Sequence, residues 1–168
     1  MFKGKTWRLL AVFSVAVVPL VLAIAASAAG GPVHKVSVGV PDFCDVPTTA
    51  QNPGCNANFS IEAQQLADGS ARGNYTDQFG HGNGGFHAAV DCLYIQGNKA
   101  WVSGIIKSGW NAGYRVLTEV VDNGTSAKDP PDTISYSYAP YAPNAFNCKV
   151  YHPALIQVAV PKGQVKVS

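Results

Sequence analysis

Charged residues are scarce in this sequence, and the residue patterns that mark common enzyme classes are missing. Asp, Glu, Lys and Arg together make up 13% of its 168 residues. The sequence contains neither a G-x-S-x-G nucleophile elbow nor an H-E-x-x-H zinc motif. Its only glutamates, Glu62 and Glu119, are predicted to lie within strands, so a glycosidase pair is a weak alternative. We therefore name no catalytic residue and favour a protein that is not an enzyme.

A pattern typical of a cleavable signal peptide fills the amino terminus. Three basic residues precede Leu9–Ala26, an uncharged apolar run that ends in the small-x-small sequence Ala26-Ser27-Ala28. A retained membrane anchor is the alternative, but Pro19 and the Ala-rich end of the run favour cleavage. We expect residues 1–28 to be removed, and the mature protein to be secreted or held in the cell envelope without a membrane anchor.

The expected mature chain carries almost no net charge. Removing residues 1–28 leaves nine basic residues against ten acidic ones, so the formal net charge changes from +2 to −1. Without a basic excess, the chain lacks the electrostatic attraction on which binding to nucleic acids depends, and we expect no such partner. Residues 29–57 read as a Pro- and Asn-rich segment, and residues 58–168 as one antiparallel β domain.

The cysteines are few and even in number, at Cys44, Cys55, Cys92 and Cys148. No two of them form the C-x-x-C pair that is typical of zinc sites. In an exported chain an even count indicates disulfides, and four cysteines allow three pairings. We favour Cys44–Cys55, which would order the loop between them, and Cys92–Cys148, which would tie a central strand to the carboxyl-terminal region.

Apolar and polar residues alternate from Asn58 onward, and Gly-containing turn signals separate the alternating runs. The predicted strands are 59–64, 72–79, 86–95, 100–107, 114–121, 133–138, 155–160 and 164–167, with a short edge strand at 35–40. About eight short strands joined by tight turns predict an antiparallel barrel or sandwich. Some strands are apolar on both faces, so we expect part of the sheet to be covered on both sides.

Several short motifs lie between Phe59 and Tyr138. They are Phe59-Ser60-Ile61, Ala67-Asp68-Gly69, Asp91-Cys92-Leu93, Gly97-Asn98-Lys99-Ala100, Ser103-Gly104, Val121-Asp122-Asn123-Gly124 and Pro130-Pro131-Asp132-Thr133-Ile134-Ser135. In this combination the chain resembles a group of bacterial secreted β-domains of unassigned function that often occur in cell-surface proteins. The resemblance covers about half the chain and implies an all-β fold and export. It also implies that Cys92 has a partner near the carboxyl terminus, where Cys148 stands. It implies no catalytic residue.

One loop holds the residue types that calcium prefers. Asp122, Asn123, Asp129 and Asp132 lie within eleven residues, and carboxylates and amide carbonyls are ligands for hard cations. The spacing differs from that of an EF-hand. The alternative is structural, because Asp and Asn side chains bond to backbone N–H groups in turns. On that interpretation Asp122 and Asp132 pin the two ends of the loop.

A weaker metal set flanks the glycine-rich segment 80–85. Asp77, His81, His87 and Asp91 would face each other across a hairpin, and His and Asp are ligands for zinc or copper. Their spacing matches no standard motif. The alternative is that they are ordinary polar residues near strand ends.

Aromatic residues are the best candidates for ligand binding. Trp110 lies in a Gly-Trp-Asn loop, and Tyr141 and Tyr151 lie in Pro-containing segments. Exposed aromatic rings stack on sugars or anchor protein partners. The alternative is that these rings pack beneath loops.

The favoured function is a secreted or cell-envelope β module that binds an extracellular protein or glycan, or that serves a structural role. The first alternative is a barrel that carries a small apolar ligand in its mouth. The second is an unrecognised hydrolase. Calcium is the one cofactor that the sequence suggests.

Overall fold

The computed structural model of the chain describes residues 31–41, 58–78, 84–126, 128–135, 141–142, 147–160 and 162–168. The predicted signal peptide and the predicted Cys44–Cys55 loop lie outside these residues. In the described part, no helix is long and apolar enough to cross a membrane.

The described residues form nine β-strands. Their bounds are β1 (His34–Val40), β2 (Phe59–Gln65), β3 (Ala71–Gln78), β4 (Gly85–Gln96), β5 (Lys99–Gly109), β6 (Arg115–Val121), β7 (Thr133–Ser135), β8 (Gln157–Ala159) and β9 (Gln164–Val167). The strands pair antiparallel in the order β8-β7-β6-β5-β4-β3-β2-β1-β9. The predicted all-β antiparallel fold is confirmed.

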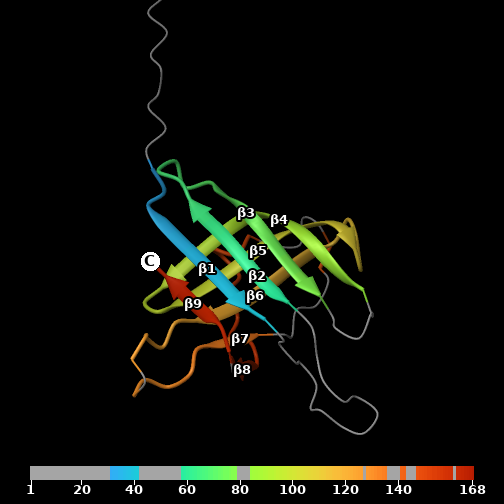
Figure 1. Ribbon diagram of the computed structural model, residues 1–168. Helices are drawn as coiled ribbons and strands as arrows, with labels where there is room; N and C mark the ends of the chain where they lie inside the picture. Colours follow the sequence, from blue (N-terminus) through green and yellow to red (C-terminus); the bar gives the residue numbers. More distant parts are fainter. Residues whose placement is uncertain are drawn as a thin grey trace, which may run out of the picture.

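The nine strands form a single sheet that curls into a half-barrel. In Figure 1, β1, β2 and β3 cross in front of β5 and β6, because the sheet turns back over its own inner face. Twisted antiparallel strands curl in this way when one face is buried. One curled sheet, rather than two stacked sheets, places the molecule on the barrel side of the predicted choice between barrel and sandwich.

Alternating apolar side chains fill the inner face of the curl. Phe59, Tyr75, Leu93 and Ile106 are among the largest fully buried residues. The Tyr75 ring lies between two others, with its centroid 5.2 Å from that of Phe59 and 5.0 Å from that of Phe86. Burial of each such side chain contributes about 2 kcal/mol before the entropic cost of ordering it.

The strand near residues 36–40 is present, but its predicted position at the sheet edge is wrong. Val36 of β1 pairs with Ala63 of β2 on one side and with Val167 of β9 on the other. Figure 1 shows β9, in red, beside β1, in blue. The carboxyl terminus therefore covers the edge that the amino-terminal strand would otherwise expose, and β1 belongs to the same sheet as the rest of the domain.

The outer face of β4 to β6 is covered as well. A β-bulge between Val90 and Cys92 shifts the alternation of β4, so that Val90 and Leu93 both face the core while Cys92 faces outward. All seven residues of β6 are buried. The expectation that part of the sheet is covered on both sides is thus confirmed.

Candidate functional site

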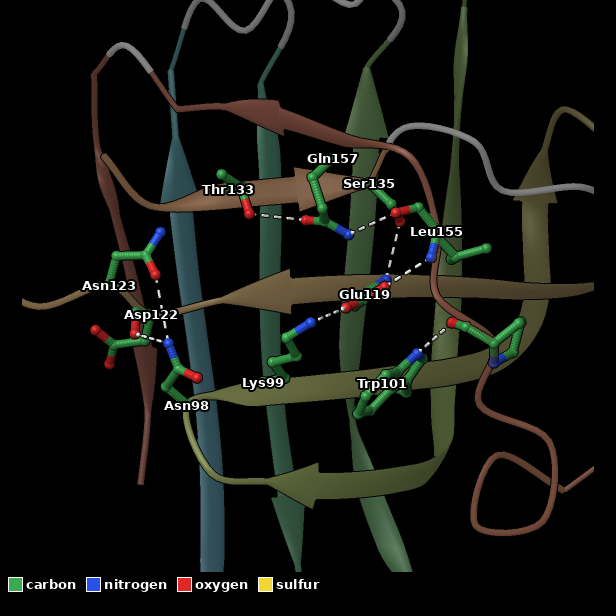
Figure 2. Close-up of polar contacts among 11 residues, drawn as sticks. Asn98, Lys99, Trp101, Glu119, Asp122, Asn123, Thr133, Ser135, Leu155 and Gln157 are labelled. Carbon is green, nitrogen blue, oxygen red and sulfur yellow. Dashed lines mark hydrogen bonds and ion pairs between the residues drawn. The ribbon is translucent and has the colours of Figure 1, made fainter. Parts of the chain in front are cut away.

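Residues 147–156, hereafter the strap, cover the outer face of β4, β5 and β6. The Cys92–Cys148 disulfide ties the strap to β4, which confirms this predicted pairing. The Trp101 indole N–H on β5 donates to the carbonyl oxygen of Pro153 at 2.7 Å, as Figure 2 shows. Cys44 and Cys55 lie outside the described residues, so their pairing remains a prediction.

Glu119 on β6 supplies a third anchor for the strap. Its side chain is 1% exposed, and its Oε2 accepts the backbone N–H of Leu155 at 2.7 Å. Its Oε1 lies 3.5 Å from Lys99 Nζ, and both contacts are drawn in Figure 2. A buried carboxylate is tolerated only when it is paired and hydrogen-bonded. Glu62 is exposed on β2, and three strands lie between β2 and β6 in the sheet, so the two glutamates form no glycosidase pair.

Beside the disulfide, Arg115 forms a bidentate ion pair with Asp91. The Nη1–Oδ1 distance is 2.6 Å and the Nη2–Oδ2 distance is 2.8 Å, while Nη1 also donates to Ser103 Oγ at 3.0 Å. The guanidinium is largely buried, whereas the Asp91 side chain is 45% exposed. Parallel bonds of this kind fix both groups. The carboxylate of Asp91 is therefore held rigidly with one side toward solvent.

Two tyrosines are linked to this ion pair, Tyr141 through the backbone of Arg115 and Tyr151 through the ring of Tyr141. Tyr141 and Arg115 exchange two backbone hydrogen bonds, of 2.7 and 2.8 Å. The rings of Tyr141 and Tyr151 meet edge to face, with centroids 6.4 Å apart. Burial raises the pKa of Tyr141 above its ordinary value of 10.0, and Tyr151 adds to the shift. We call Asp91, Arg115, Tyr141 and Tyr151 the ledge.

The structure brings together two of the three predicted ligand-binding aromatics. Tyr151 is 44% exposed on the strap, and Tyr141 is in ring contact with it. Trp110 is 43% exposed in the turn between β5 and β6, where its backbone N–H donates to the carbonyl oxygen of Gly85 at the start of β4. The backbone of Trp110 is thus held by β4, whereas Tyr141 is bridged to the start of β6.

Asp122 and Asp132, two predicted calcium ligands, close the half-barrel. Asp122 directly follows β6, and Asp132 directly precedes β7. Asp132 Oδ2 accepts the N–H of Val165 at 2.9 Å, and Asp122 Oδ2 accepts the N–H of Val167 at 3.0 Å. The other oxygen of each carboxylate accepts a backbone N–H within the loop, at 2.8 and 3.0 Å. All four carboxylate oxygens thus bond to the backbone, in an arrangement that we call the carboxylate seam.

The seam forms where β6 is already paired on both sides, with β5 on one side and β7 on the other. Val120 and Val121 of β6 pair with Ile134 and Thr133 of β7. Strand β9 therefore forms no backbone ladder with β6, although the two strands lie close together in space. Unpaired N–H groups along a strand edge are unfavourable when they are shielded from water. The two carboxylates satisfy them instead.

The other predicted calcium ligands lie in the same loop. The Asn123 side-chain amide donates to Pro131 O at 2.8 Å, and Asp129 Oδ2 accepts the N–H of Ser126 at 2.8 Å. A surface cavity of about 570 Å³ lies between this loop and the turn joining β8 to β9. Across the described ranges, no group of three or more His, Cys, Asp or Glu side chains could hold a metal ion. The calcium site remains a prediction, while the seam gives Asp122 and Asp132 a structural role.

The weaker metal set does not assemble. Asp77 is buried among the inward-facing residues of β3, whereas His87 is exposed on the outer face and lies 3.0 Å from the Thr76 hydroxyl. Asp91 is bonded to Arg115. His81 lies outside the described residues. Because the β-sheet separates Asp77 from His87, these residues cannot share one ion.

Sequence reasoning missed the roles of Arg115 and Glu119. Both stand within the apolar run 114–121, and a charge inside a strand that is apolar on both faces indicates a buried pair. That signal was present in the sequence. The partners were not evident, because Asp91 is 24 residues from Arg115 and Leu155 is 36 residues from Glu119.

No protein-family model, curated protein or solved structure matches the chain at a significant level.

Proposed function

We propose that this chain is an exported, non-enzymatic recognition module that binds an extracellular partner through the ledge. One observation carries the proposal. A half-exposed carboxylate and a half-exposed tyrosine are both tied to the outer face of the sheet, the first by a bidentate ion pair and the second through a disulfide and a ring contact with the bridged Tyr141. Groups that are rigid before binding lose little conformational entropy on association, which favours recognition.

The packing of the interior supports a surface site over the alternative of a small-ligand carrier. A carrier needs an open apolar cavity of several hundred Å³. Here Phe59, Tyr75, Phe86 and Ile106 occupy the enclosed space, each at most 4% exposed. Three cavities among the described residues open at the surface, one beside the loop between β6 and β7, one over β2 and β3, and one beside the ends of β1 and β2.

Export is supported by the signal-peptide pattern, by the resemblance to bacterial secreted β-domains, and by the disulfide. Disulfides persist in oxidising compartments and are rare in the cytosol. Cys92–Cys148 also secures the segment that carries Tyr151, so an oxidising compartment would preserve the ledge.

Binding of the purified mature protein to intact cells of the source organism tests this function. We expect saturable binding to the cell surface that Tyr151→Ala weakens, whereas Trp110→Ala, a matched change at an equally exposed aromatic, leaves it unaltered. Binding that both variants retain in full would refute the ledge as the recognition surface. Detection of amino-terminal residue 29 by sequencing would confirm the predicted cleavage.

A further inference from the structure

Resting on the proposed function, we infer that the ledge recognises a neutral glycan. The ledge combines an aromatic ring with a carboxylate, and this combination indicates the class of partner. Sugars present faces of C–H bonds that pack on aromatic rings, and they present hydroxyls that bond to carboxylates. Tyr151 offers the ring, and Asp91 offers the carboxylate.

The ring and the carboxylate are connected by two independent paths. Asp91 is bonded to Arg115, whose backbone pairs with Tyr141, and the Tyr141 ring contacts Tyr151. In the other direction, Asp91 is followed by Cys92, whose disulfide partner Cys148 lies three residues before Tyr151. These links place Asp91 and Tyr151 in the same region of the outer face, and an oligosaccharide of several sugar rings is long enough to contact both.

The charge of the ledge favours a neutral ligand. Arg115 compensates the charge of Asp91 at distances of 2.6 and 2.8 Å, and the ion pair has no net charge. An anionic ligand would meet the exposed carboxylate, because the guanidinium is the buried partner. Each carboxylate oxygen has two lone pairs, so it can accept a hydroxyl proton while keeping its bond to Arg115. Uncharged hydroxyl groups fit this surface best.

A glycan also fits better than a protein partner. The centres of protein–protein interfaces are depleted of charged residues and enriched in packed apolar groups. On the ledge, a half-exposed carboxylate is one of the groups offered to a partner. The exposed large hydrophobic residues of the described part are instead spread over several elements. They are Val33, Trp110, Tyr114, Val150, Tyr151 and Ile156.

The test is calorimetric titration of the mature protein with neutral oligosaccharides of the cello-, xylo-, manno- and chito- series. We expect one series to bind, with an affinity that Tyr151→Ala lowers about tenfold, which corresponds to about 1.4 kcal/mol and lies within the range for an aromatic contact. Asp91→Asn should lower it by a similar factor. Tyr151→Phe should retain most of the affinity because the ring is kept, and Trp110→Ala should retain all of it. Unchanged melting temperatures would show that the variants are folded.

Two outcomes would overturn the inference, and they differ in what they mean for the proposed function. If no neutral oligosaccharide binds while Tyr151-dependent binding to intact cells persists, the partner is of another class and the recognition function stands. If neither binding is observed, both proposals are wrong. Oligosaccharide binding that Trp110→Ala abolishes and Tyr151→Ala does not would place the glycan site elsewhere.

Discussion

At the scale of single residues, two buried charged side chains stand out because of their partners. Glu119 and Arg115 are each held by groups from distant parts of the chain. Tyr75 is fully buried in the core, where burial raises its pKa well above the ordinary value of 10.0 and the charge of Asp77 adds to the shift. We therefore expect the free energy of unfolding to respond to small changes in these side chains.

Tyr75 makes the stability of the domain depend on alkaline pH. Below about pH 10 the phenol is neutral in both the folded and the unfolded state, so its contribution to stability is complete. Above that pH the unfolded chain loses the proton while folded Tyr75 keeps it, and the free energy of unfolding falls by up to about 1.4 kcal/mol per pH unit. Urea unfolding between about pH 9 and 11.5 measures this fall, which Tyr75→Phe should reduce by that amount. Equal slopes for both proteins would contradict the prediction.

Glu119 should respond differently to two substitutions. Glu119→Gln keeps an acceptor for the Leu155 N–H and leaves the half-exposed Lys99 to water, so we expect a loss of about 1 kcal/mol in unfolding free energy. Glu119→Ala removes the acceptor and opens a void, which should cost about 3 kcal/mol. Chemical denaturation measures both values. A smaller loss for Ala than for Gln would mean that the carboxylate does not anchor the strap.

At the scale of elements, the strap and the loop between β6 and β7 each make contacts that the backbone ladders do not. The strap packs on β4 to β6, and the loop is bonded to β9. The strap gives the outer face of β4 to β6 its cover. In the turn that precedes β9, Gly163 has φ of +106°, and a Cβ there would meet Gly39 O at 2.1 Å. Only glycine fits this approach of the turn to β1.

Removing the strap disulfide should destabilise the domain more than removing the predicted amino-terminal pair. Cys92 and Cys148 are 56 residues apart, and the loop-entropy relation gives about 4 kcal/mol for such a loop, against about 3 kcal/mol for Cys44–Cys55. Melting temperatures of the two double Ala variants test the order. Equal shifts would contradict it. Non-reducing peptide mapping checks the Cys44–Cys55 pairing separately.

At the scale of the whole molecule, closure of the curled sheet depends on side chains. Strand β9 is bonded to β1 by a backbone ladder and to the loop between β6 and β7 by the carboxylate seam. The ladder and the seam together link the first and last strands of the chain to the end of the sixth.

The seam predicts that Asp132 stabilises the domain whether or not calcium is present. Asp132→Ala removes the acceptor of two backbone N–H groups, and we expect a loss of about 2–3 kcal/mol. Asp132→Asn should be almost as harmful, because its amide would turn a donor toward one of these N–H groups. Asp129→Ala, a control in the same loop, should cost less than about 1 kcal/mol.

Calorimetric melting in millimolar calcium and in chelator completes this experiment. A loss for Asp132→Ala that appears only with calcium would contradict the structural role and support the predicted calcium site. A loss of the same size in both conditions would support the seam. A melting temperature of the wild-type protein that does not respond to calcium would remove the metal hypothesis.

The sequence by itself determined the local structure of this protein. Period-two alternation placed β2 to β6 and β9 within a few residues, and Asp68-Gly69, Gly97-Asn98 and Lys162-Gly163 marked turns, because strand alternation and turn chemistry are local properties. The even cysteine count indicated disulfides, and Cys92–Cys148 was the favoured pairing.

Only the tertiary structure decided which distant groups meet. It placed β1 between β2 and β9, turned the predicted calcium carboxylates toward β9, and set Asp91 beside Arg115. These contacts depend on the curl of the sheet and on a bulge in β4, and both arise from packing across the whole chain. A strand's own residues determine which face is apolar, but the neighbours that cover this face are determined by the fold.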